Sequence, residues 1–152
     1  MDYLQEFQAV HITFACGNMY LVNCEQSSIQ EVGEIPDGIL AASWAPNQEN
    51  LAVATPLKML LFTPEFDVLY ESELDDGDLT FYNLTSNQVK DQTISEACIS
   101  WRGDSGIFVC TYQINGGRKC LTRDVQQSMK ISKGPARADY QIVFSVSEKP
   151  VP

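Results

Sequence analysis

The chain of 152 residues contains a single histidine, His11, and has neither a Gly-x-Ser-x-Gly elbow nor a glycine-rich phosphate loop. Nucleophilic hydrolases need a base beside the nucleophile, and nucleotide-binding enzymes need backbone amides around a phosphate. His11 itself lies in an apolar, strand-like run. We therefore expect a protein that is not an enzyme, with no catalytic residues, no cofactor and no metal site.

Cysteine pairs with metal-binding or disulfide spacing are also lacking. The five cysteines, at positions 16, 24, 98, 110 and 120, are odd in number, and no two have Cys-x-x-Cys spacing. The sequence therefore signals neither a disulfide framework nor a zinc knuckle. Cys16, Cys98 and Cys110 lie in apolar runs, where a free thiol packs as a small hydrophobic group. A reduced, intracellular setting is the favoured interpretation.

No apolar run approaches the ~18 residues that a membrane-spanning helix requires, so no membrane partner is expected. The N-terminus does not have the features of a signal peptide. Asp2 stands where a basic region belongs, and Gln5, Glu6 and Gln8 interrupt any apolar stretch.

Basic residues are scarce in the first two thirds of the chain. Residues 1–96 contain sixteen acids and two bases, Lys58 and Lys90, whereas residues 97–152 contain eight bases and four acids, for a net charge of −10. An acidic surface repels phosphate, which argues against a nucleic-acid groove in the first part. For the basic segment, residues 97–152, a solvated surface is the favoured interpretation, and direct contact with RNA is the alternative. The bases of this segment include Arg118, Lys119, Arg123, Lys130, Lys133 and Arg137.

Helical periodicity is absent, and short strand patterns separated by turn signals dominate. We expect strands at 9–15, 19–24, 29–35, 39–44, 51–55, 58–63, 66–72, 98–101, 107–114, 120–125 and 141–147. Turn signals lie at 17–18, 36–38 and 115–119, and a loop is expected at 132–139.

Two segments repeat one scheme. "AASWAPNQENLAVAT" (41–55) matches "CISWRGDSGIFVCT" (98–111): a Ser-Trp pair closes a strand, a polar turn follows, and an apolar strand ends in threonine. Trp44 and Trp101 are 57 residues apart, which exceeds the roughly 40–45 residues of a WD-type propeller blade. We assign the excess to an acidic inter-blade loop at 74–96.

The sequence thus predicts an all-β fold, a partial WD-repeat-like β-propeller of about two and a half four-stranded blades, at approximately 1–36, 37–73 and 97–152. The leading strand of the first blade is expected to be cut short at Met1. So few blades cannot close a ring, so we expect a piece of a longer protein, with exposed apolar faces on its terminal blades.

Four motifs have plain structural interpretations. Arg102-Gly103-Asp104 resembles an adhesion ligand, but it lies between two apolar strands and reads as a tight turn in which the glycines bend the chain. Asn83-Leu84-Thr85 matches the glycosylation pattern, which matters only in a secretory chain. The run "ELDDGDLT" (73–80) does not meet the EF-hand spacing, so we expect a solvated acidic loop, with a docking site for a basic partner as the alternative. Trp44 and Trp101 are expected to pack between blades rather than to bind a ligand.

The run from Gly38-Ile39 through Ser43-Trp44, Gln48-Glu49 and Ala54-Thr55 to Phe66, followed by "ISWRGDSGIFV" (99–109), resembles a specific family. It is similar to the N-terminal propeller region of the largest Elongator subunit, an IKAP-type scaffold, over roughly residues 1–120. The chain departs from that family at Asn47 and Pro56, both in turns. The match fails after Lys119.

The resemblance implies a non-catalytic scaffold or assembly subunit of the Elongator complex, which modifies wobble uridines of tRNA in the cytoplasm, with the nucleus as a second location. It implies other Elongator subunits as protein partners, tRNA contact only through the complex, and homodimerisation through a region outside this chain. One alternative is a generic WD-repeat interaction module of another intracellular complex. A secreted adhesion domain using Arg102-Gly103-Asp104 is a third hypothesis.

Overall fold

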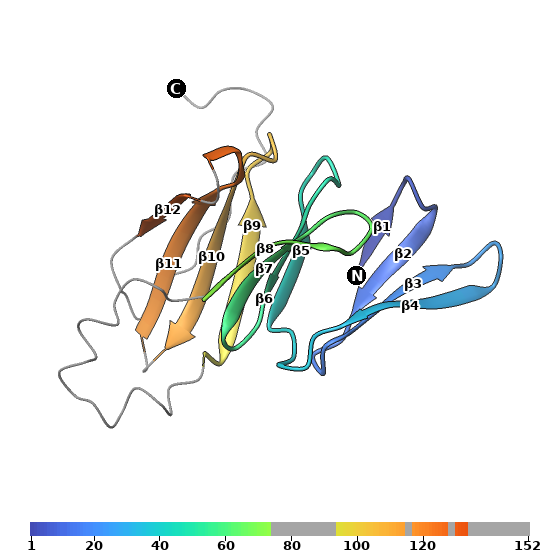
Figure 1. The fold of residues 1–152 in the computed structure, drawn as a ribbon, viewed down its shortest axis with the longest axis horizontal. Helices are drawn as coiled ribbons and strands as arrows, with labels where there is room; N and C mark the ends of the chain where they lie inside the picture. Colours follow the sequence, from blue (N-terminus) through green and yellow to red (C-terminus); the bar gives the residue numbers. More distant parts are fainter. Residues whose placement is uncertain (74–93, 115–116, 128–129, 134–152) are drawn as a thin grey trace.

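The computed structural model describes residues 1–73, 94–114, 117–127 and 130–133. These residues form three four-stranded antiparallel sheets, each a simple meander (Figure 1). The first contains β1 (Asp2–Leu4), β2 (Ala9–Thr13), β3 (Asn18–Asn23) and β4 (Ser28–Glu34). The second contains β5 (Ala41–Trp44), β6 (Leu51–Ala54), β7 (Lys58–Phe62) and β8 (Val68–Glu73). The third contains β9 (Glu96–Trp101), β10 (Ile107–Ile114), β11 (Gly117–Asp124) and β12 (Lys130–Lys133), with a short 3-10 helix, η2 (Val125–Gln127), after β11.

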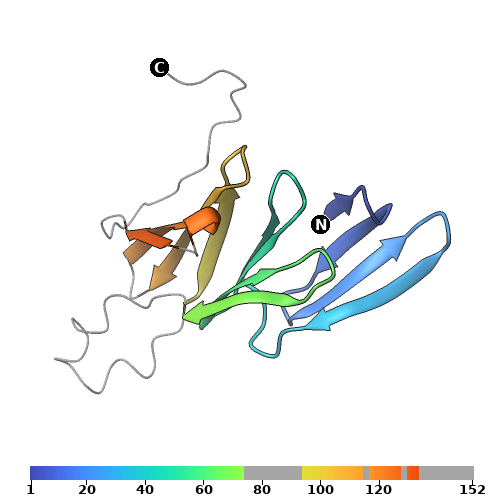
Figure 2. The same ribbon diagram turned by 45° about the horizontal axis from the view of Figure 1, so that its top comes forward.

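The sheets lie side by side like the blades of a propeller, as the two ribbon views agree (Figures 1 and 2). The all-β, partial-propeller prediction is confirmed. Where the sequence predicted about two and a half blades, the structure gives each unit four strands. The expected short leading strand is β1, with three residues.

Each gap between neighbouring sheets holds one hydrophobic cluster. The first cluster includes Leu51, Val53 and Leu60 of the middle sheet, and the second includes Ala52, Ala54 and Leu61 of the same sheet. Side chains alternate between the two faces of a strand, so β6 and β7 contribute to both clusters. This explains their unbroken apolar sequence, since a strand buried on both faces has no solvent side.

The strand register corrects the alignment of the repeat. Trp44 pairs with Leu51 and Trp101 with Phe108, so a constant offset of 57 residues relates the two sheets. Thr111 is therefore the counterpart of Ala54, not of Thr55 as the sequence match suggested. The sequence match paired the two threonines because they are identical. That pairing made the two turns differ in length by one residue, whereas the register shows turns of equal length.

Two glycines shape the chain where the first sheet leads into the second, Gly17 in the β2–β3 turn and Gly38 in the β4–β5 connection. Gly17 has φ +108°, and a Cβ there would lie 1.9 Å from the carbonyl oxygen of Ile35. Gly38 has φ +84°, and its Cβ would lie 2.8 Å from the oxygen of Ala15. Both turn signals were visible in the sequence, and here only glycine combines this backbone angle with such close approach.

Two parts of the third sheet differ from the prediction. β11 begins at Gly117, within the segment predicted as a turn, and β12 covers Lys130–Lys133, for which no strand was predicted. Strand "KISK" has a single apolar residue, so its sequence carries little β signal. The predicted strand at 141–147 and most of the acidic segment 74–96 lie outside the described residues, and the blade boundaries stay predictions.

Candidate functional site

The turns that follow the first strand of each sheet are joined by hydrogen bonds across the blades. The side-chain amide of Gln48 donates to the carbonyl of Tyr3 (2.8 Å) and accepts from the backbone N–H of Gln5 (3.1 Å). On its other side, the N–H of Asn47 donates to Oγ of Ser105 (3.0 Å). This row of turns is the end of the molecule where the candidate site lies.

The turns of the second and third sheets have the same backbone form. Gln48 and Ser105 both have a left-handed φ, 59° and 62°. Each N–H donates to the carbonyl three residues earlier, of Ala45 and Arg102. Sequence reasoning had assigned the bend to Gly103 and Gly106. This is corrected here, because neither glycine has a positive φ.

The two charged side chains of the Arg102-Gly103-Asp104 sequence are hydrogen-bonded to each other. Nε and Nη2 of Arg102 donate to the two carboxylate oxygens of Asp104 at 2.9 and 2.6 Å, and the N–H of Gly106 also donates to Asp104, at 3.0 Å. The hydrogen bond from Arg102, followed by that from Gly106, lowers the pKa of Asp104 to about 2. The turn prediction is confirmed, and the two charged groups that an adhesion receptor would bind already bind each other.

The two tryptophans pack between sheets, as predicted. Each is 8% exposed. Nε1 of Trp44 donates to Nδ1 of His11 (2.9 Å), and Nε1 of Trp101 donates to the carbonyl of Ser43 (2.9 Å). In both cases the acceptor belongs to the preceding sheet, so each indole joins its own sheet to the preceding one.

His11 is a buried part of the interface between the first two sheets. It is 2% exposed, and its ring lies 5.6 Å from that of Trp44 and 5.1 Å from that of Phe66. Burial lowers its pKa to about 4. A neutral imidazole is consistent with its acceptor role toward the indole. This contact joins residues 33 positions apart, which no local pattern could predict.

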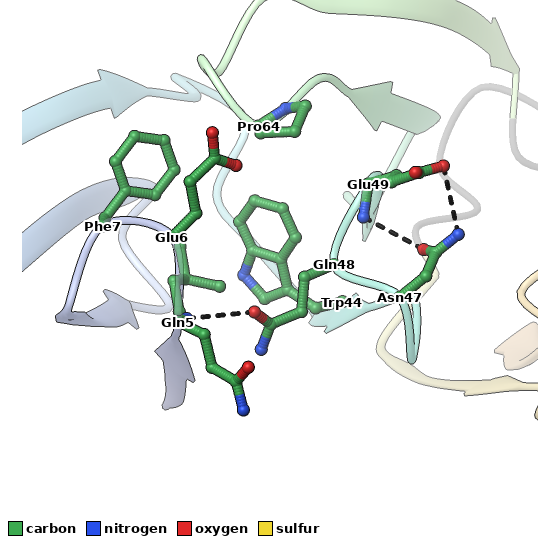
Figure 3. A pocket seen from close by; sticks show the side chains of 9 residues that line it. Gln5, Glu6, Phe7, Trp44, Asn47, Gln48, Glu49 and Pro64 are labelled. Carbon is green, nitrogen blue, oxygen red and sulfur yellow. Dashed lines mark hydrogen bonds between the residues drawn. The ribbon is translucent and has the colours of Figure 1, made fainter.

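A pocket of about 330 Å³ opens between the first and second sheets at this end. Figure 3 shows the indole of Trp44 between Glu6 and Phe7 of the first sheet and Gln48 of the second, with Pro64 opposite. The sequence analysis named no residue of this pocket as a binding site. Its walls come from the ends of β1 and β5 and from the β1–β2, β5–β6 and β7–β8 turns, and the side-chain amide of Gln48 joins two of these turns.

The basic residues considered for RNA contact are placed differently from one another. Arg123 is fully buried, and it donates to Oγ of Ser72 (2.9 Å) and to the carbonyl of Glu73 (3.3 Å). Arg118 forms an ion pair with Glu96 at 2.6 Å. The inclusion of Arg123 among the bases that could contact RNA is therefore wrong, since a buried guanidinium cannot reach a phosphate. Lys130, Lys133 and Arg137 have side chains outside the described set.

All five cysteines are free thiols. Cys110 is buried, and burial raises its pKa to about 12, which makes it an inert packing group. Cys16, predicted to be packed, is exposed. It lies in the turn before β3, where its thiol donates to the side chain of Asn18 at 3.2 Å.

Some predicted sites cannot be placed. Asn83 and nearly all of the acidic run 73–80 lie outside the described residues. Within the described ranges, no three His, Cys, Asp or Glu side chains are grouped to hold a metal ion. That part of the chain also has no helix long and apolar enough to cross a membrane. The absence of catalytic residues stays a prediction.

A family model described as the ELP1 first N-terminal beta-propeller matches residues 1–87. Elongator complex protein 1 of Drosophila melanogaster is 28% identical over 141 residues, covering 74% of this chain and 11% of that protein. The protein of the same name in Mus musculus is 29% identical over 76 residues, covering 49% and 6%. In Schizosaccharomyces pombe it is 27% identical over 88 residues, covering 55% and 7%. The chain spans about a tenth or less of the length of these relatives.

Two solved structures share the fold. An uncharacterized protein of Listeria monocytogenes superposes with a TM-score of 0.53 at 9% identity, over 82% of this chain and 36% of that one. A protein of Lactobacillus plantarum gives 0.51 at 7% identity, over 80% and 36%. At such identities the likeness describes the fold alone.

Proposed function

Because the chain belongs to the family of the ELP1 first N-terminal β-propeller, we propose that it is a non-catalytic scaffold segment of an Elongator complex. The observation that carries this is the family match over residues 1–87, on a chain whose three sheets form consecutive blades. The proposed partners are other Elongator subunits, in the cytoplasm with the nucleus as a second location. Wobble-uridine modification of tRNA would be the activity of the assembly, not of these residues.

A scaffold role agrees with where the polar groups of the chain are used. The side-chain hydrogen bonds of Trp44, Trp101, Gln48 and Arg123 join one blade to the next. Catalysis instead requires a nucleophile, base or metal converging on one pocket. We infer that tRNA binds only through the complex, and that homodimerisation depends on a region outside this chain.

The test is affinity purification of the full-length gene product. We expect it to co-purify with the Elongator catalytic subunit, and deletion of the gene to remove the modified wobble uridines from digested tRNA, as measured by mass spectrometry. No co-purification together with intact wobble modification would overturn the proposal. Co-purification with a different, stable intracellular assembly would favour a generic interaction module instead.

A further inference from the structure

We draw no further inference here: the strongest candidate, a groove of about 320 Å³ between β4 of the first sheet and β7 and β8 of the second, has a floor of buried side chains that pack between the two sheets, and nothing in the structure shows what covers it.

Discussion

The indole N–H of Trp44 donates a hydrogen bond to an imidazole, whereas the equivalent N–H of Trp101 donates to a backbone carbonyl. The difference follows from the second strand of each preceding sheet. His11 of β2 faces the second sheet, whereas the β6 residues in the cluster with Trp101 are Ala52 and Ala54. Alanine side chains offer no acceptor, so Nε1 of Trp101 donates to the carbonyl of Ser43.

The stability of the interface between the first two sheets should depend on the protonation of His11. Burial lowers its pKa from 6.5 to about 4. The unfolded chain therefore takes up a proton before the folded chain does as pH falls. The contribution of neutral His11 to stability is fully present above pH 6.5 and is lost as pH falls through 4, on the order of 3 kcal/mol.

We expect His11→Asn to flatten this dependence, because asparagine keeps an acceptor near the position of Nδ1 and does not titrate. Urea unfolding at pH 7.5, 6.0 and 5.0 measures it. Carboxylates contribute equally to both proteins, so the difference between them isolates His11. Parallel pH profiles for the wild type and the variant would contradict the prediction.

The Arg102–Asp104 pair makes a second prediction at this scale. Both charged groups are engaged with each other, so the folded chain should not support receptor-dependent cell adhesion. Surfaces coated with the folded chain are compared with surfaces coated with a linear Gly-Arg-Gly-Asp-Ser peptide. We expect adhesion only to the peptide. Adhesion to the folded chain that a competing soluble peptide abolishes would show that the turn opens.

At the scale of strands, Arg123 of β11 is the least expected residue of the third blade. Its pairing partner is Phe108, and the corresponding pair in the second blade is Leu51 with Phe62. The buried guanidinium thus stands where the second blade has a phenylalanine. Its contacts to Ser72 and Glu73 attach β11 to the last residues of β8.

Arg123→Ala should destabilise the chain by about 2–4 kcal/mol, because it leaves a large void and removes the donors to Ser72 and Glu73. Arg123→Met should cost less or nothing, since an apolar side chain of similar length refills the space without burying a charge. Urea unfolding of both variants at one pH gives the comparison. An equal loss in both would mean that the hydrogen bonds, not the packing, carry the contribution.

The strands show what could be predicted from the sequence and why the rest could not. Apolar runs such as "LAVA" and "KMLLF" and the glycines of the connections carry strong local signals, so β6, β7 and Gly17 were predictable. Strand β12 was not, because pairing with β11 decides its conformation more than its own composition does. The bends at Gln48 and Ser105 were missed because these polar residues have no marked preference for a left-handed φ.

For the candidate site, the limit was distance along the chain. The tryptophan repeat could be recognised because two continuous segments, 41–55 and 98–111, can be aligned directly. The pocket could not be predicted, because Glu6, Trp44 and Pro64 come from three separate segments that lie together only once the blades have stacked. The same holds for the acceptor of Trp44, which sits on a different sheet.

At the scale of the whole molecule, the outer face of the first sheet has no other sheet packed against it within the described residues. Tyr3, Val10, Val22 and Ile29 are successive cross-strand partners, so their side chains lie on one face. His11, adjacent to Val10, faces the second sheet, which places this row on the opposite side. Tyr3 and Ile29 are 55% and 73% exposed.

Such a face should drive the isolated 152-residue chain to associate in solution. We expect light scattering after size-exclusion chromatography to give a mass that rises with concentration. The variant Tyr3→Glu, Ile29→Glu should shift the chain toward monomer, because two carboxylates on this row make its burial costly. Leu57→Glu is the matched control, since Leu57 is equally exposed at 55% but lies in the β6–β7 turn. A monodisperse monomer that melts cooperatively without these changes would mean that the face is stable in water, and that the three blades need no further neighbour.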